Sequence, residues 1–425
     1  MVRWLLVAPA LLAVLLAVLE GGAFVVAEGD ATCSGIVPMK SREKTVSITD
    51  FGGVGDGETL NTAAFKNAIS HIAQQNAPGG TLLYIPAGVW LTGAFNLTSH
   101  MTLFLAKDAV VTATQDTSNW PLIDPLPSYG RGRELPGGRY MSLIHGNGLR
   151  DVIITGTLVV SKFLRISLIR LDLHNIMSSY HCSNVVVKNV TVLAPHDSPN
   201  TDGVDPGILL YPADSSLNVC IEDCYISTGD DLVAVKSGWD EYGIAYSRPS
   251  SGITVLRVTG SSPFAGIAIG SETSGGIENV FAENLDIFKT GIGIHIKTNS
   301  GRGGFIRNIT ISDVNLNNVR KALRITGNAG DHPDDGYDPN ALPVVDGLTI
   351  KNVWGVGVQQ PGSIQGIKDS PFTQICLSNV NLSVTSSREV PWTCAEVSGG
   401  ALEVQPSPCA ELTSVNGIRF CTNVV

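Results

Sequence analysis

The sequence predicts an all-β protein whose chain is wound as a single-stranded parallel β-helix. Composition is the first observation: 46 of the 425 residues are glycine and only 16% are charged, whereas soluble chains average about 25% charge. Residue type is the second, because long stretches of Val, Ile, Thr, Asn, Gly and Ser favour short strands and tight turns. The third is an internal repeat. Disorder, coiled coil and fibre are excluded.

The repeat is a turn residue (Asn, Asp or Gly), then alternating β-branched residues, then Asn or Asp again. Its copies begin at Asp151, Asn184, Asn218, Ile253, Glu278, Arg307, Asp346 and Ile375. These starts lie about 25 to 39 residues apart, too close for a βαβ unit with its loops and too regular for a sandwich of hairpins. We therefore expect coils whose inward Val, Ile and Leu stack, with Asn and Gly at bends that need positive φ. A large sandwich or a propeller is the alternative fold.

A helix is expected near the N-terminal end of this stack, from residue 61 to 73. Phe65, Ile69 and Ile72 fall on one stripe of that helix, with Asn61 or Thr62 as its N-cap. Because the first coil of a solenoid has no neighbour, we expect this helix to cap the open end.

The first 27 residues differ from the rest. Arg3 precedes an apolar run from Trp4 to Leu19, broken only by Pro9, and small residues follow as far as Ala27. This pattern predicts a secretory signal peptide at 1–27 and one β-helix domain at 28–425. An uncleaved membrane anchor is the alternative, although the run is short for a spanning helix.

Cysteine and sequon content fits an exported glycoprotein. The cysteines are Cys33, Cys182, Cys220, Cys224, Cys376, Cys394, Cys409 and Cys421. All eight can pair, and we expect local links, with the C-terminal end stapled because four lie in the last 50 residues. Their spacing does not indicate a metal site. Glycosylation sequons occur at Asn96, Asn189, Asn308 and Asn381.

The formal net charge is −10, and no basic block interrupts the sequence. A nucleic-acid partner therefore has no electrostatic basis.

Two acidic clusters are the strongest functional signal. One turn runs from Ser198 to Asp205 and includes Asp202, and the next contains Asp230 and Asp231, 28 residues after Asp202. Because this is about one coil, the second cluster should lie directly above the first. Neighbouring carboxylates raise one another's pKa, and a protonated acid beside an ionised one is the pair that glycoside hydrolysis uses. A Ca²⁺ site and a solvated acidic turn are the alternatives.

A cationic segment lies downstream. His295 and Lys297 alternate with an inward pair of isoleucines, and Arg302 follows in a glycine-rich stretch. Cations on an acidic protein indicate an anionic ligand. The alternative is an ordinary exposed strand face.

Nearly all of the chain after residue 27 resembles glycoside hydrolase family 28, the polygalacturonases, and within it the plant exo-polygalacturonase-like branch. The phrases that carry the resemblance are Asp50 to Gly57, Ile85 to Gly93, Trp120 to Arg133, Asn200 to Gly203 and Gly229 to Asp231. The resemblance implies a right-handed parallel β-helix of the pectin-lyase type, pectin (galacturonan) as substrate, no cofactor and no metal. It also implies a secreted cell-wall enzyme, and we expect a monomer without stable membrane insertion.

The resemblance also implies roles for individual residues. Asp230 matches the general acid, and Asp202 and Asp231 match the acids that hold the attacking water in an inverting mechanism. Lys297 matches a lysine that binds a galacturonate carboxylate. Further substrate-binding residues are expected to be Lys236, His295, Arg302 and Tyr337.

Three departures from the family pattern bear on activity. Ala265 stands where the family has an active-site histidine, and His295 stands where it has an arginine, which loses a permanently charged fork. Residues 158–173 resemble no coil, so that a coil is expected to be missing there. A catalytically impaired pectin-binding homologue or splice product therefore remains an alternative to the hydrolase, and so does a Ca²⁺-dependent pectin lyase.

Overall fold

A computed structural model describes residues 33, 42–130, 139–156, 177–180, 182–206, 218–385 and 391–425. The predicted signal peptide at 1–27 and the atypical segment at 158–173 lie outside these residues.

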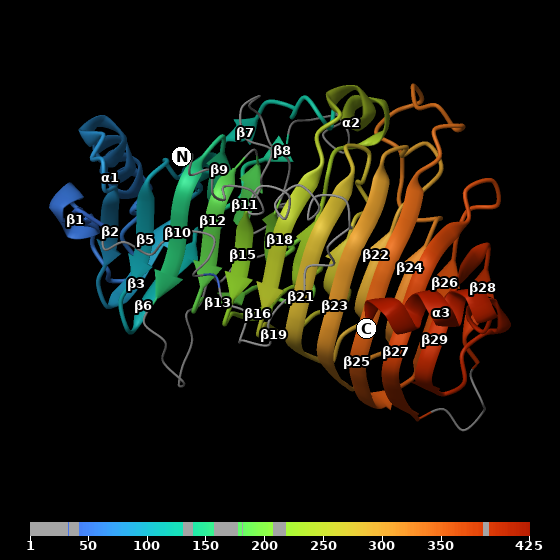
Figure 1. Ribbon diagram of the computed structural model, residues 1–425. Coiled ribbons are helices and arrows are strands. Elements are labelled where there is room, and N and C mark those ends of the chain that lie inside the picture. Colours follow the sequence, from blue (N-terminus) through green and yellow to red (C-terminus); the bar gives the residue numbers. More distant parts are fainter. Residues whose placement is uncertain are drawn as a thin grey trace, which may run out of the picture. The chain divides into compact units, whose positions relative to one another are not determined.

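Two parallel sheets build the fold, and their strands alternate along the chain (Figure 1). The first sheet has the order β1 (Lys44–Ser47), β2 (Thr81–Ile85), β5 (Met101–Leu105), β10 (Arg150–Gly156), β12 (Ser183–Lys188), β15 (Val219–Glu222), β18 (Ser250–Leu256), β21 (Ile277–Phe288), β23 (Phe305–Asn317), β25 (Val344–Val358), β27 (Phe372–Val384), β29 (Val397–Gln405), with β13 (Thr191–Leu193), β16 (Tyr225–Ser227) and β19 (Thr259–Ser261) beside it. The second sheet has the order β4 (Phe95–Asn96), β9 (Ile144–Asn147), β11 (Met177–Tyr180), β14 (Val204–Pro206), β17 (Val233–Val235), β20 (Ala265–Ile269), β22 (Ile292–Lys297), β24 (Lys321–Thr326), β26 (Gln360–Gln365), β28 (Thr393–Ala395).

Smaller elements complete the described part of the chain. Strands β3 (Gly88–Thr92) and β6 (Ala109–Ala113) pair in parallel, and β7 (Leu122–Ile123) and β8 (Arg139–Tyr140) pair antiparallel. The helices are α1 (Thr62–Gln75), α2 (Asp240–Tyr246) and α3 (Val415–Val424), with short 3-10 turns at Ile48–Phe51, Thr117–Asn119 and Ala410–Leu412. None of these helices is both long and apolar enough to cross a bilayer.

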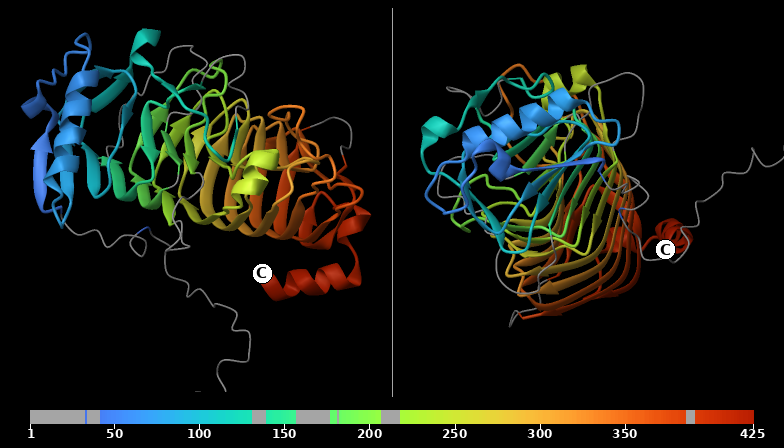
Figure 2. Two further views of the ribbon diagram at one scale, coloured as in Figure 1. Left: turned by 90° about the horizontal axis from the view of Figure 1, so that it is seen from above. Right: turned by 90° about the vertical axis from the view of Figure 1, so that its left-hand side faces the viewer.

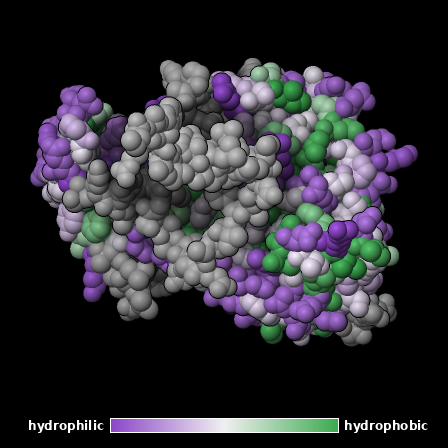
Figure 3. All heavy atoms as spheres, in the orientation of Figure 1, coloured by the Kyte–Doolittle hydropathy of each residue, from purple (hydrophilic) through white to green (hydrophobic). Residues whose placement is uncertain are grey.

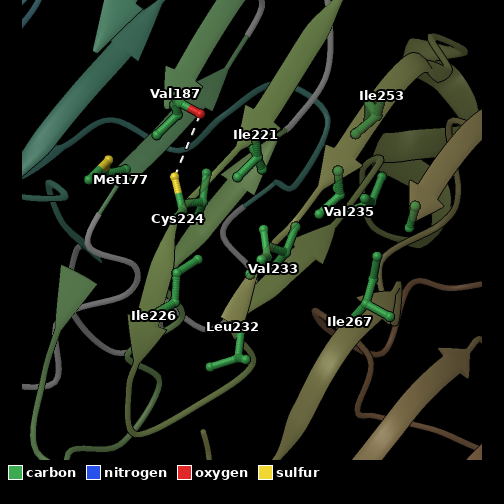
Figure 4. Close-up of a cluster of buried hydrophobic side chains, with 14 of the residues drawn as sticks. Met177, Val187, Ile221, Cys224, Ile226, Leu232, Val233, Val235, Ile253 and Ile267 are labelled. Carbon is green, nitrogen blue, oxygen red and sulfur yellow. Dashed lines mark hydrogen bonds between the residues drawn. The ribbon is translucent and has the colours of Figure 1, made fainter. Parts of the chain in front are cut away.

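Register between coils makes the core a column of like side chains. One buried aliphatic position recurs from coil to coil of the first sheet at Val152, Val185, Val219, Ile253, Val280, Ile309, Leu348 and Ile375. The second sheet supplies the facing side chains, such as Val233, Val235 and Ile267 (Figure 4). This confirms the parallel β-helix. Strand β10 pairs directly with β12, so the stack continues across the atypical segment.

Asparagine and aspartate occupy many bends, as predicted. Asn279, Asn308 and Asn352 adopt positive φ values of 51–55°, which their short polar side chains tolerate better than most. Their side chains also join neighbouring coils: Asn308 Nδ2 donates to Asn279 Oδ1 at 2.6 Å, and Asn379 Nδ2 donates to Asn352 Oδ1 at 2.8 Å. The bends therefore contribute a hydrogen-bonded ladder as well as a change of direction.

Helix α1 lies at the end of the stack formed by β1 and β2 (Figures 1 and 2). The predicted stripe is buried, and Phe65 stacks on Phe95 of β4 with ring centroids 4.4 Å apart. Asn61 is the N-cap residue, but its side chain binds Val54 instead of the helix: Oδ1 accepts from the Val54 N–H at 2.7 Å. The capping helix is confirmed, and its cap residue anchors the preceding loop.

Disulfides confirm one expectation and overturn two. Cys376–Cys421 and Cys394–Cys409 staple the C-terminal end, as predicted. Cys33–Cys220, however, joins positions 187 residues apart, so links are not all local. Cys224 forms no disulfide: it is a buried thiol whose Sγ donates to the Val187 carbonyl at 3.7 Å (Figure 4). The expectation that all eight cysteines pair is therefore wrong, because the stack buries Cys224 as a core side chain.

Helix α3 packs thinly. It buries Gly417 and Cys421, while Val415 is 82% exposed and Ile418 and Val424 are also exposed. Figure 3 shows hydrophobic residues among hydrophilic ones in the region where Figure 1 places α3. Because little apolar area of α3 is removed from water, packing alone holds the helix weakly. We therefore expect the disulfide between Cys421 and Cys376 of β27 to provide much of the free energy that keeps α3 on the coils.

Replacing both Cys376 and Cys421 by alanine should release α3. The disulfide closes a segment of 45 residues, and its loss should lower the free energy of unfolding by about 2–4 kcal/mol. Limited trypsin digestion should then cut at the exposed Arg419 well before the coils are digested. Cys224→Ala is the control. Equal digestion rates in the two variants would show that packing alone holds the helix.

Candidate active site

The two acidic turns lie one directly above the other, as the sequence predicts. Each precedes a strand of the second sheet, β14 or β17, and Val204 pairs with Val233. The Gly203 N–H donates to the Asp231 carbonyl at 3.0 Å, and the Asp230 N–H donates to the Thr201 carbonyl at 3.2 Å. These backbone bonds fix the relative heights of the acids.

Two glycines make this close stacking possible. A Cβ on Gly229 would lie 2.0 Å from the Ser198 carbonyl oxygen, and one on Gly203 would lie 2.5 Å from the Leu232 carbonyl oxygen. Because real Cβ atoms do not approach backbone that closely, any side chain there would force the turns apart. The glycine beside each aspartate is therefore part of what holds the acids together.

Lys236 joins two acids of the lower turn. Its Nζ donates to Asp202 Oδ2 at 2.6 Å and to Asp205 Oδ2 at 2.7 Å. Burial opposes the charge on Lys236, but the two carboxylates raise its pKa well above its ordinary value. Asp205 is fully buried, and burial together with the charge of Asp202 raises its pKa well above the usual range. Lys236 therefore acts first as the counterion of these acids.

Lys297 is the counterion of Asp231 in the upper turn. Its Nζ donates to Asp231 Oδ2 at 2.7 Å, and burial, which lowers its pKa, is outweighed by the Asp231 charge, which raises it. The other carboxylate oxygen, Asp231 Oδ1, accepts from the Ala265 N–H at 2.9 Å. Ala265 stands where the resemblance implies a histidine, and its backbone N–H is thus the donor that this position offers to Asp231.

Asp230 is more accessible to a ligand than Asp202 and Asp231, because it is half-buried while they are buried. Burial, followed by the charges of Asp202 and Asp231, raises its pKa to about 7. The carboxyl group therefore keeps a proton in mildly acidic solution. A protonated carboxyl beside carboxylates that accept from lysine is a proton donor next to proton acceptors.

His295 lies on β22 between the core residues Ile294 and Ile296, on the opposite face from them. Burial, together with the charges of Lys297, Arg324 and Lys321, lowers its pKa to about 2. His295 is therefore a neutral imidazole, and it does not supply the charge expected of it as a cation.

Arg302 is a correction to the sequence prediction. Its side chain is fully buried, Nη1 forms an ion pair with Asp240, Nε donates to the Ser271 carbonyl at 2.9 Å, and Nη2 donates to the Asp331 carbonyl at 2.8 Å. A guanidinium that is committed in this way cannot reach a polysaccharide.

Tyr337 lies in the same group of loops. Its ring stacks on His332 with centroids 3.4 Å apart, and His332 Nδ1 contacts Asp240 Oδ2 at 2.5 Å. The structure thus joins Tyr337 to the Arg302–Asp240 ion pair through His332. Its role in substrate binding stays a prediction.

Two buried acids of this site have no role assigned from the sequence: Asp205, at the end of the first acidic cluster, and Glu272. Glu272 raises the pKa of both Asp205 and Lys236 through its charge. The sequence does offer a signal for Asp205, because it alternates along the strand with Val204, a core residue that pairs with Val233. Glu272 follows β20 in an irregular loop, and no pattern in the sequence around it indicates a role in the site.

The geometry does not favour a cation site at these acids. Within the described residues, groups of three metal-binding side chains whose ligand atoms lie within 4.8 Å of one another occur at Cys33, Cys220 and Glu222 and at Cys394, Cys409 and Glu411. All four of these cysteines are in disulfides. The described aspartates of the two acidic clusters are not among these groups, and three of them bond to Lys236 or Lys297.

Comparisons with known proteins identify a family for this chain. Residues 158–406 match the model of the family "Glycosyl hydrolases family 28". A probable polygalacturonase of Vitis vinifera is 44% identical over 411 residues, covering 88% of this chain and 82% of that protein. An exopolygalacturonase of Zea mays is 26% identical, covering 80% and 84% of the two chains. The fold resembles the crystal structure of an exopolygalacturonase from Thermotoga maritima, with a TM-score of 0.60 at 24% identity over 85% of this chain and 92% of the other.

Asp230→Asn should change how stability depends on pH. The pKa of Asp230 rises from 3.8 to about 7 on folding, so the folded chain holds this proton more tightly, and stability falls as pH rises from about 4 to 7. Asparagine does not titrate. The variant should therefore gain stability relative to the natural chain across this window, by on the order of a few kcal/mol above pH 7.

Denaturant unfolding at pH 4, 5, 6, 7 and 8 measures this difference. Asp335→Asn, in an exposed loop, is the control and should show no such trend. A constant difference between Asp230→Asn and the natural chain at every pH would mean that Asp230 is ionised throughout.

Proposed function

The chain belongs to the glycosyl hydrolases of family 28, and on this premise we propose that it hydrolyses α-1,4-galacturonosyl bonds of pectin. The observation that carries the proposal is the position of Asp230, which retains a proton to about pH 7 because it is partly buried between Asp202 and Asp231. The names of its relatives in Vitis vinifera and Zea mays support galacturonan as the substrate.

In the proposed reaction, Asp230 gives its proton to the glycosidic oxygen as the bond between that oxygen and the anomeric carbon breaks. Asp202 and Asp231 hold a water molecule and accept its proton, and the water oxygen bonds to the anomeric carbon. A general acid and a general base on separate residues suit inversion at that carbon. The products are two shorter chains, and Asp230 is then reprotonated from solvent.

The two lysines have a defined part in this scheme. Lys236 contacts Asp202 at 2.6 Å and Lys297 contacts Asp231 at 2.7 Å. Each ammonium group favours the ionised form of the acid that must accept a proton. Asp230 forms no hydrogen bond with either lysine in the described structure, and burial with the charges of Asp202 and Asp231 raises its pKa to about 7. Of the three acids of this scheme, Asp230 is therefore the one that we assign as the proton donor.

A Ca²⁺-dependent lyase is less well supported. The family consists of hydrolases, and the described carboxylates of the two turns are not grouped as ligands of one cation. A pectin-binding homologue without turnover rests on Ala265 and on the neutral His295. Unchanged pectin binding by a folded chain that releases no reducing sugar would favour that alternative.

We further propose that residues 1–27 direct export and that residues 28–425 act as one extracellular domain at the cell wall. Exposed sequons at Asn96, Asn308 and Asn381 support glycosylation there. Mass spectrometry of the secreted protein would show both the new N-terminus and any attached glycans.

Asp230→Asn should reduce the release of reducing sugar from polygalacturonate about 10²–10⁴-fold, because general acid catalysis contributes rate enhancements of that size. The KM should change little if the carboxamide still fits. Asp335→Asn again serves as the control. Retention of full activity by Asp230→Asn would refute its role as the acid.

The hydrolysis rate should also fall as the pH rises through about 7. The pKa of Asp230 is raised to about 7. Above that pH, the fraction of molecules with a protonated Asp230 falls about tenfold for each pH unit. Measuring kcat/KM from pH 4 to 9 tests this. Activity that still increases between pH 7 and 9 would exclude Asp230 as the proton donor.

A further inference from the structure

The face of the second sheet opposite the core continues beyond the acids. Registered pairing aligns one position of each successive strand on this face, namely Ala234, Ala268, His295, Arg324 and Ser363. Asp205 lies at the acidic end of this row, because the residue before it, Val204, pairs with Val233, the residue before Ala234. Leu323 and Ile325 of β24 face the core, so Arg324 between them faces the other way. The acidic end of this row and Arg324 therefore share one surface.

Cations gather at the β24 end of the row. Arg324 and Lys321 are half-buried, and Arg320 is exposed just before the strand. Burial lowers the pKa of Lys321, and the charges of Arg324 and Arg320 lower it further, with no carboxylate opposing them. Lys321 Nζ donates to Ser363 Oγ at 3.2 Å. Among the described residues, no ion pair engages any of these three cations, whereas Lys236 and Lys297 each pair with an acid.

A second observation at the same place also indicates a ligand. His295 is 8% exposed, and its Nε2 has no hydrogen-bond partner in the described structure. His295 pairs in register with Arg324, and a neutral imidazole nitrogen can donate or accept a hydrogen bond. A buried polar atom without a partner costs free energy unless a ligand satisfies it.

We propose that Arg324 and Lys321, with His295 Nε2, form a binding site for the carboxylate of a galacturonate unit of the bound chain. The inference rests on the proposed function for its ligand class. Arg324 offers a planar fork that matches a carboxylate, Lys321 adds a point charge, and His295 bonds to a carboxylate or ring oxygen. This arrangement supplies the anion binding that the ion-paired lysines beside the catalytic acids do not.

The spacing of strands makes the two sites compatible. β24 is three strands beyond β17, which follows Asp230, and adjacent strands lie about 4.8 Å apart. A carboxylate at Arg324 is thus about 14 Å from the catalytic coil, beyond the Debye length of about 8 Å at physiological ionic strength. Its charge leaves the proton on Asp230 little affected.

Arg324→Gln tests the site in two assays. Isothermal titration calorimetry with oligogalacturonate, in a background of Asp230→Asn so that no turnover occurs, should show Kd raised about tenfold or more. In the active chain, KM should rise for de-esterified polygalacturonate while kcat changes little. Highly methyl-esterified pectin, which lacks the charge, should show a much smaller change. Arg324→Lys should recover part of the lost affinity.

Arg307→Gln is the matched control, because Arg307 is an exposed arginine on the first sheet that pairs with Glu278 at 2.7 Å. Equal affinity in Arg324→Gln and Arg307→Gln would overturn the inference. So would equal losses for the charged and the esterified substrates, which would indicate damage to the fold. If the natural chain hydrolyses nothing but binds oligogalacturonate through Arg324, the proposed function fails and this inference stands.

Discussion

Stacking of successive coils in register is the constraint on which the rest of the structure depends. It aligns the buried aliphatic positions that form the core, and the same alignment places Gly203 against Asp231 and Asp230 against Thr201. A shift of one residue in a strand would turn its core side chains to the opposite face. Apolar packing in the core therefore fixes the height of each acid on the outer face.

The electrostatics of the site follow from that placement. Stacking brings Asp202, Asp205, Asp230 and Asp231 into neighbouring coils, and two lysines bond to three of them, Lys236 just after β17 and Lys297 at the end of β22. The lysines pair with Asp202, Asp205 and Asp231, whereas Asp230 forms no hydrogen bond with either lysine in the described structure, and burial and its like-charged neighbours raise its pKa to about 7. The same pairing engages Lys236 and Lys297, whereas Arg324, further along the sheet, forms no ion pair among the described residues.

The loops beside the sheets carry a different kind of interaction. Arg302 and Asp240 are both fully buried and form an ion pair, His332 joins the same carboxylate, and Tyr337 stacks on His332. Removing one partner of such a pair would leave a buried charge uncompensated, which typically costs about 3–5 kcal/mol. This network fixes the loops to one another, and it shows how a cation with a sequence pattern typical of ligand binding can serve the fold instead.

The sequence by itself determined the parallel β-helix, the capping helix and the closeness of the two acidic turns, because each follows from a short repeat whose period equals one coil. It could not decide the partners of the charged residues. Whether Arg302 is buried, whether Lys236 faces two acids, and whether Cys33 meets Cys220 depend on which coils and loops come together in space. The parts played by Glu272 and Arg324 likewise depend on their neighbours in other coils. Period and residue type are local properties, whereas burial and charge pairing arise from contacts between segments far apart in the chain.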